Sequence, residues 1–259
     1  MMNVSCNLFC TLLILIAVTC SASTPLSKNF KDGLLENNNG NFLEAFNTWL
    51  VGAESGDPMS QFAIATLYRK GVGVDKDLER SSKWMLKSAK AGYVEAMRNL
   101  GSSYLSGVSG FDKDIVKSVE WYEQAAIFGT YYDQHAIAAL YGTTEFESYD
   151  SDDIKKFYWA KKSVEYYRSK YILGEIYYRG NAVEKDLVKS WVFIKLFHEE
   201  HLKDPKFSEL DRKTQNFYIS NPDYLEIEEE LTKEEKEKGE LLLPKARKDI
   251  DILFGGGGR

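Results

Sequence analysis

Residues 100–129 read LGSSYLSGVSGFDKDIVKSVEWYEQAAIFG, and the order of residue types in this stretch recurs along the chain. Its first five residues place an aliphatic residue, a small residue and a tyrosine at positions i, i+1 and i+4, which share one helical face. A glycine-containing turn ending in Lys-Asp follows, and then a basic residue, a serine and a tryptophan. Glycine commonly ends a helix and aspartate commonly caps the next one. The stretch therefore predicts two antiparallel helices joined by a turn.

The spacing of this pattern is regular. Tyr68, Tyr104, Tyr141 and Tyr177 are separated by 36, 37 and 36 residues. An aliphatic residue lies four positions before each tyrosine and a small residue lies three before it; the pairs are Ile64 and Ala65, Leu100 and Gly101, Ile137 and Ala138, and Leu173 and Gly174. A fixed period of this length indicates stacked repeats. The sequence predicts an all-α solenoid of antiparallel helix-turn-helix repeats of about 36 residues each.

The second helix of each repeat has its own pattern. Three aspartates precede a tryptophan by seven residues, and from a fourth the seventh residue is a phenylalanine; the pairs are Asp77 and Trp84, Asp114 and Trp121, Asp152 and Trp159, and Asp186 and Phe193. A basic residue lies three positions after each aspartate: Arg80, Lys117, Lys155 and Lys189. We interpret the tyrosines and tryptophans as core packing between helices rather than as a ligand-binding aromatic box.

The full pattern resembles the Sel-one-like repeat, a relative of the tetratricopeptide repeat. The clearest matches are residues 100–104 and 71–77, and the resemblance covers about residues 30–200. It implies a right-handed α-solenoid used mostly for protein–protein contact. Exported bacterial members of the family serve as envelope adaptors, as regulators of exopolysaccharide or motility, and in host interaction. Some carry a cysteine pair in every repeat and are linked to penicillin binding, but the repeats here contain no cysteine, which argues against that branch.

The N-terminus predicts export. Residues 1–22 contain no charged side chain, and the apolar run from Leu8 to Val18 ends in small residues. Eleven helical residues span about 16 Å, which is too short for a hydrocarbon core of about 30 Å, so a cleaved signal peptide is expected. The protein would then be periplasmic or secreted. Residues 16–20 also resemble the box before a lipidated cysteine, so a lipoprotein anchored at Cys20 is the alternative.

These signals predict four segments. We expect a signal peptide at residues 1–22, the repeat solenoid at 23–202, C-terminal capping helices at 203–254 and a disordered tail at 255–259. Capping helices are needed because a terminal repeat exposes an apolar face. Helical spacing is present in residues 207–219 and 224–231, Thr232 and Glu235 form a predicted capping box, and Pro244 is expected to kink or restart the last helix.

Composition and motifs argue against several classes of function. The formal net charge of −6 leaves no basic excess for nucleic acid. His198 and His201 share a helical face, but no third metal ligand is identifiable and the zinc-protease spacing is absent. The sequence has neither a Gly-x-Ser-x-Gly elbow nor a phosphate-binding glycine loop. We therefore expect no catalytic residue, no metal, no cofactor and no enzyme activity.

The remaining candidate is a binding surface on the first helices of the repeats, which line the groove of such a solenoid. Residues six and seven positions before the tyrosines supply the candidates: Gln61, Arg98, Gln134, His135, Lys170 and Tyr171. Their mixed polar and aromatic character suits another protein or an extended peptide segment. We expect membrane contact only if Cys20 is lipidated.

The predicted function is an exported scaffold that mediates protein–protein interaction in the bacterial envelope or the extracellular space. Two alternatives stay open. One is a peptidoglycan- or glycan-associated envelope protein or hydrolase-like enzyme. The other is a purely structural solenoid whose N-terminal segment is retained as an anchor.

Overall fold

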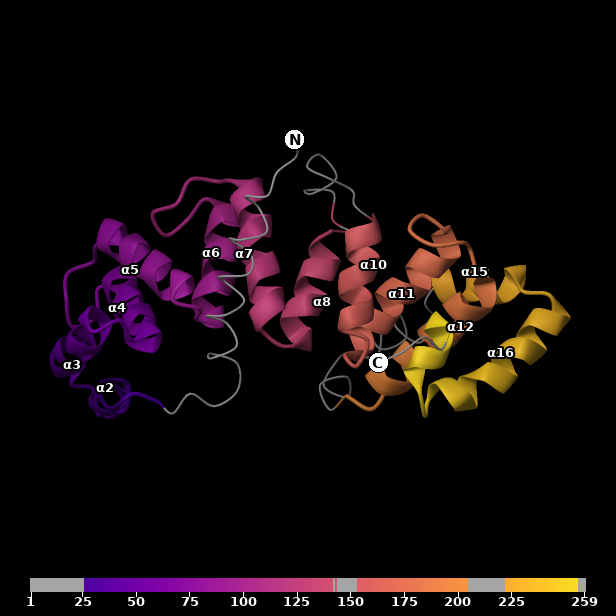
Figure 1. The fold of residues 1–259 in the computed structure, drawn as a ribbon, viewed down its shortest axis with the longest axis horizontal. Helices are drawn as coiled ribbons and strands as arrows, with labels where there is room; N and C mark the ends of the chain where they lie inside the picture. Colours follow the sequence, from indigo (N-terminus) through magenta and orange to yellow (C-terminus); the bar gives the residue numbers. More distant parts are fainter. Residues whose placement is uncertain (1–25, 142, 144–152, 205–221, 256–259) are drawn as a thin grey trace, which may run out of the picture. The chain divides into compact units, whose positions relative to one another are not determined.

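The computed structural model describes residues 26–141, 143, 153–204 and 222–255, and every regular element among them is helical. The chain divides into two compact units, residues 1–129 and 130–259 (Figure 1). The predicted signal peptide, Cys20 and the helical pattern at residues 207–219 lie outside the described residues, as does all of the predicted tail except Gly255.

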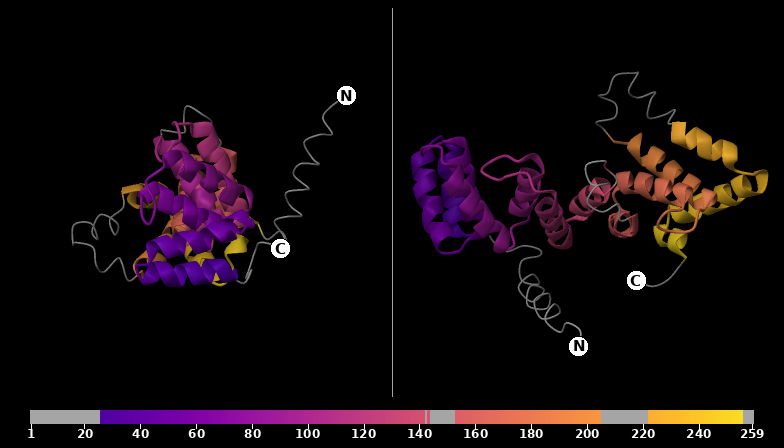
Figure 2. Two further views of the ribbon diagram at one scale, coloured as in Figure 1. Left: turned by 90° about the vertical axis from the view of Figure 1, so that its left-hand side faces the viewer. Right: turned by 90° about the horizontal axis from the view of Figure 1, so that it is seen from above.

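In its described part, residues 26–129, the first unit contains three helical hairpins. They are α2 (Lys28–Asn38) with α3 (Phe42–Glu54), α4 (Pro58–Lys70) with α5 (Leu78–Lys90), and α6 (Val94–Ser106) with α7 (Ile115–Phe128). Helix α3 packs against α4, and α5 packs against α6, so that each hairpin covers the next (Figure 2). This is the predicted arrangement of stacked helix pairs.

The second unit continues the repeat and then departs from it. Its helices are α8 (Tyr131–Leu140), α10 (Asp153–Lys162), α11 (Tyr167–Arg179), α12 (Leu187–His201), α15 (Pro222–Glu230) and α16 (Lys233–Ala246), followed by the 3-10 helix η1 (Ile250–Phe254). Helix α8 pairs with α10, and α11 pairs with α12. Both α15 and α16 pack against α12.

The tyrosine pattern forms the core, as predicted. The aliphatic residues Ile64, Leu100, Ile137 and Leu173 are all 0% exposed. The small residues permit close approach of the partner helix: a Cβ atom on Gly101 would lie 2.8 Å from the ring of Tyr122, and one on Gly174 would lie 2.5 Å from Cδ1 of Ile194. Size at this position therefore sets the separation between the two helices of a hairpin.

A serine holds the two helices of three hairpins together. The hydroxyls of Ser81, Ser118 and Ser190 donate hydrogen bonds of 2.8 Å to the backbone carbonyls of Ala65, Gly101 and Gly174, respectively. All three serines are buried. In the α8–α10 hairpin the same position, four residues after the repeat aspartate, is occupied by Lys156, whose buried ammonium lies 3.9 Å from Oε2 of Glu175.

The predicted aspartate caps are confirmed for α5, α7 and α12. In each case the carboxylate accepts a hydrogen bond from the backbone N–H three residues later. The basic residue at that later position also contacts the repeat tyrosine: the charged groups of Arg80, Lys117 and Lys189 lie 5.6, 5.5 and 5.1 Å from the ring centroids of Tyr68, Tyr104 and Tyr177. Cap, cation and tyrosine thus form one recurring local unit.

The C-terminal helices contain the predicted capping box. The Thr232 hydroxyl accepts from the Glu235 N–H, and the Glu235 carboxylate accepts from the Thr232 N–H. Pro244 lies inside α16, which continues to Ala246. Gly239 brings α16 close to α12, because a Cβ atom there would lie 3.0 Å from the Trp191 indole.

Candidate functional site

Two of the six predicted groove residues lie in the first unit. Gln61 on α4 is only 7% exposed, and its Nε2 donates to the carbonyl of Ala53 at 3.1 Å. Arg98 on α6 is exposed, and its guanidinium lies 3.3 Å from the carboxylate of Glu95. Gln61 therefore has a structural contact inside the unit, whereas Arg98 is accessible.

The other four lie in the second unit. Gln134 and His135 are half-buried on α8, and Nδ1 of His135 lies 3.0 Å from the Ser169 hydroxyl. Lys170 is 6% exposed, and its ammonium donates to the Glu200 carboxylate at 2.6 Å. Tyr171 is half-buried and packs against an aromatic ring of α12. Binding through these six residues stays a prediction.

The second unit also presents a group of tyrosines that the groove prediction did not include. Tyr131, Tyr132, Tyr166 and Tyr167, which we call the tyrosine patch, form an unbroken series of ring contacts. Ring centroids lie 4.4 Å apart between Tyr131 and Tyr132, 4.9 Å between Tyr132 and Tyr166, and 5.2 Å between Tyr166 and Tyr167. Tyr131 is 41% exposed and Tyr132 is 55% exposed, so the patch reaches solvent on α8.

Helix starts position the patch. Tyr131 and Tyr132 open α8, whose first turn is fixed by a capping box in which the Thr130 N–H donates to Asp133 at 2.9 Å. Tyr166 and Tyr167 occupy the N-cap and first position of α11. Because both helices begin at the same end of the unit, the two Tyr-Tyr pairs come together.

The inner end of the patch is anchored to α12. The Tyr167 ring stacks on Phe197 with a centroid distance of 5.9 Å, and its hydroxyl donates to the Asp204 carboxylate at 3.0 Å. Tyr166 in turn packs edge-on against the His135 ring at 4.8 Å. One side of the patch thus packs against other side chains of the unit, while Tyr131 and Tyr132 remain accessible.

The electrostatics of the patch favour neutral side chains. Burial, reinforced by the nearby Arg168 guanidinium, lowers the pKa of His135 to about 4. A hydrogen bond with Tyr132 raises the pKa of Tyr131, and burial raises the pKa of Tyr167. At neutral pH the patch therefore presents uncharged rings and hydroxyls beside the exposed cation of Arg168. Such a surface can pack against apolar side chains and hydrogen-bond to a peptide backbone.

One sequence signal could have identified this patch. The doublets Tyr131-Tyr132 and Tyr166-Tyr167 stand at the starts of two first helices of the repeat, about ten positions before the repeat tyrosines. The predicted groove positions lie six and seven residues before those tyrosines, so the doublets fall one helical turn N-terminal to them.

A metal site and a membrane-spanning helix each place requirements on the residues that the structure describes. Within them, no group of three or more His, Cys, Asp or Glu side chains could hold a metal ion. Among the same residues, none of the helices combines the length and the apolar character that a membrane span requires. Burial lowers the pKa of both His198 and His201, which lie at the end of α12.

Comparison with known proteins identifies the repeats. The sequence model described as the Sel1 repeat matches residues 58–93, 94–127 and 168–193, which correspond to α4–α5, α6–α7 and α11 with the first half of α12. The α8–α10 hairpin is not among the matched ranges, and it is the hairpin that has Lys156 in place of serine.

Two curated proteins share this sequence signal. Chitin synthase regulatory factor 3 of Schizosaccharomyces pombe is 32% identical over 82 residues, which are 32% of this chain and 9% of that protein. The putative sel1-like repeat-containing protein L21 of Acanthamoeba polyphaga mimivirus is 26% identical over 138 residues, which are 52% of this chain and 24% of that protein. The chain thus spans less than a quarter of the length of either relative.

A solved structure shares the fold. The crystal structure of a Sel1 repeat protein from Oxalobacter formigenes matches with a TM-score of 0.57 and 26% sequence identity, covering 66% of this chain and 70% of that one. The similarity supports the predicted helical-repeat fold.

Proposed function

Since this chain carries Sel1 repeats, we propose that it is a scaffold that binds an extended segment of another protein through the tyrosine patch. Proteins built from such repeats generally mediate protein–protein interaction. The supporting observation is the exposure of Tyr131 and Tyr132 beside Tyr166 and Tyr167, which pack against His135 and Phe197.

Tyrosine suits this role for a physical reason. Its ring supplies a large contact area at a low cost in side-chain entropy, and its hydroxyl can hydrogen-bond to peptide groups. Tyrosine is also enriched among the few residues that dominate binding energy at protein interfaces. The mutual ring contacts hold Tyr131 and Tyr132 in place before a partner arrives, which lowers the cost of ordering them.

A pull-down with three forms of the mature chain tests the proposal. The double variant Tyr131→Ala/Tyr132→Ala removes the exposed half of the patch. Tyr158→Ala is the matched control, because Tyr158 lies on α10 of the same unit and is 50% exposed. The proposal expects a partner that the wild type and Tyr158→Ala recover and the double variant loses. Equal recovery by all three forms would contradict it.

We place this interaction outside the cytoplasm, in the bacterial envelope or the extracellular space. The support is the uncharged, apolar leader that ends in small residues before Ser23. N-terminal sequencing of the mature protein tests this location. A start near Ser23 supports a periplasmic or secreted protein, a lipid-modified Cys20 supports a lipoprotein, and an intact Met1 contradicts cleavage of the N-terminal segment.

A peptidoglycan or another envelope glycan is the competing ligand, because tyrosine rings can also pack against the apolar faces of sugars. Sedimentation with purified cell wall separates the two. If the wild type pellets with the wall and the Tyr131→Ala/Tyr132→Ala variant does not, the patch is a glycan site rather than a protein site.

A further inference from the structure

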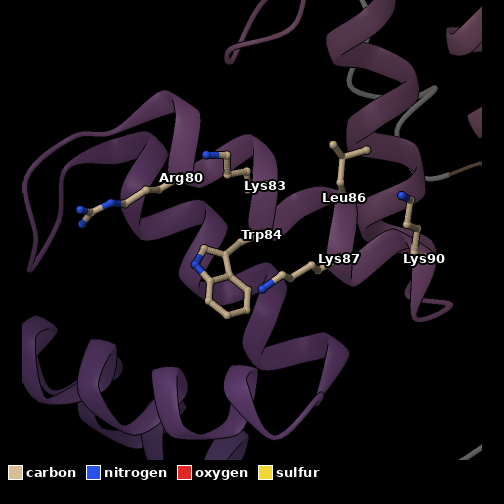
Figure 3. A pocket seen from close by; sticks show the side chains of 6 residues that line it. All are labelled: Arg80, Lys83, Trp84, Leu86, Lys87 and Lys90. Carbon is tan, nitrogen blue, oxygen red and sulfur yellow. The ribbon is translucent and has the colours of Figure 1, made fainter.

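Helix α5 of the first unit carries a row of four cations. Arg80, Lys83, Lys87 and Lys90 are spaced by three, four and three residues, which places them along one face of the helix. Together with Trp84 and Leu86 they line a pocket of about 370 Å³ (Figure 3). All four basic residues are exposed, whereas Trp84 and Leu86 are half-buried.

The four cations differ in the contacts that they make with other side chains of the protein. Arg80 contacts the cap Asp77 at 3.3 Å, and Lys83 contacts Glu79 at 2.6 Å. The Lys87 ammonium lies 4.0 Å from the centroid of the Trp84 ring. Within the described residues, neither Lys87 nor Lys90 forms an ion pair. The C-terminal half of the row is therefore available to an anionic partner.

The other repeats show that the row is not needed for the fold. The four hairpins from α4–α5 to α11–α12 each have a cation at the position of Arg80, where it contacts the repeat tyrosine. The positions of Lys83, Lys87 and Lys90 are occupied by Glu120, Gln124 and Ile127 in α7, by Tyr158, Lys162 and Glu165 in α10, and by Val192, Leu196 and Glu199 in α12. Lys83 and Lys90 thus have no basic counterpart in α7, α10 or α12, and only Lys162 of α10 repeats the charge of Lys87. The complete row occurs in α5 and requires another explanation.

We propose that this row is a second docking surface, which binds an acidic segment of another protein. An acidic segment would be complementary in charge to α5, which contains four basic residues and one acidic residue in a chain whose net charge is −6. Ten residues of helix separate Arg80 from Lys90, a distance of about 15 Å, which an extended peptide covers in about five residues.

Two apolar side chains beside the cations indicate which kind of acidic segment would fit this surface. The Trp84 indole and the Leu86 side chain line the same pocket as the cations and add apolar surface that an apolar or aromatic side chain can contact. The segment that fits best has several carboxylates around one such residue. A polyanion without apolar groups would pair with the cations but would leave Trp84 and Leu86 without an apolar contact.

Fluorescence anisotropy with two labelled peptides tests the proposal. The probe has four acidic residues around one phenylalanine, and the control peptide has glutamine in place of each acid. The mature full-length chain should bind the probe and not the control, and binding should weaken when NaCl rises from about 50 to about 300 mM.

Matched variants locate the site. Lys87→Glu/Lys90→Glu should weaken probe binding at least about tenfold, because two attractive charges become repulsive. Lys236→Glu/Lys238→Glu, on the exposed face of α16, makes the same change in net charge and should leave binding unaltered. The Tyr131→Ala/Tyr132→Ala variant should also bind normally, so this test is independent of the tyrosine patch.

Three results would overturn the proposal. The first is no preference of the wild type for the acidic probe over the glutamine control. The second is an equal loss in the α5 and α16 charge variants, which would show a general charge effect. The third is that a single-stranded oligonucleotide competes as strongly as the acidic peptide, which would make the row a non-selective polyanion surface.

Discussion

The hydroxyl of Ser118 on α7 donates a 2.8 Å hydrogen bond to the backbone carbonyl of Gly101 on α6. The same bond joins Ser81 to Ala65 and Ser190 to Gly174. In each hairpin the acceptor is the small residue that allows the helices to approach. Close packing and a directional bond therefore fix the same point of the hairpin.

We expect Ser118→Ala to lower the free energy of unfolding by about 1 kcal/mol, because a buried hydrogen bond between helices is lost. Urea unfolding measures the change. Ser82→Ala is the control, since its hydroxyl bonds only to the carbonyl of Glu79 within an exposed turn of α5. A Ser118→Ala loss no larger than the Ser82→Ala loss would contradict the role assigned to the interhelical bond.

Gly174→Ala tests the close approach of α11 and α12. Helix propensity alone would make alanine more favourable than glycine by about 1 kcal/mol. The new Cβ would instead lie 2.5 Å from Cδ1 of the fully buried Ile194 and 3.3 Å from the carbonyl of Ser190. We expect a net destabilisation of about 1–3 kcal/mol, visible as a lower Tm. An unchanged or higher Tm would show that the helices can separate freely.

The second unit should be sensitive to mild acid. The pKa of His135 is about 4 in the folded protein, below its value of 6.5 in the unfolded chain. The unfolded state therefore takes up a proton first, so the stability due to neutral His135 is complete above pH 6.5 and is lost as the pH falls toward 4. Burial lowers the pKa values of His198 and His201 in the same direction.

Thermal unfolding at pH 7 and pH 5.5 checks this prediction. His135→Gln retains a polar group facing Ser169 and cannot titrate, so its Tm should fall less over this interval than that of the wild type. The lowered carboxylate pKa values of Glu199, Glu230 and Glu235 affect stability only at lower pH. An identical fall in both proteins would assign the acid sensitivity to other groups.

Much of the repeat fold could be predicted from the sequence because its signals are local. The small residue beside each aliphatic one and the aspartate caps act within one helix or one turn, and the period of the tyrosines can be counted directly along the chain. The function of Ser118 could not be predicted in this way, since it depends on how two helices face each other. Nor does sequence spacing indicate a boundary between compact units at Gly129 and Thr130.

The tyrosine patch shows the same limit. The Tyr166-Tyr167-Arg168 stretch stands where the three earlier repeats have a glycine, and the sequence shows a second tyrosine doublet there without showing what that doublet contacts. Its relation to Tyr131 and Tyr132 arises when α8 and α11 begin at the same end of the second unit. Likewise, buried Lys170 pairs with the partly exposed Glu200, which lies 30 positions later on α12, so the pattern of the first helices alone does not reveal this contact.

Site-specific photo-crosslinking tests the central claim most directly. Benzoylphenylalanine replaces Tyr132 of the tyrosine patch in one variant and Tyr158 of α10, which is similarly exposed, in the other. Irradiation of producing cells should yield a discrete protein adduct at position 132 and none at 158. The same adduct at both positions, or no protein adduct at 132, would contradict a protein-binding role for the patch.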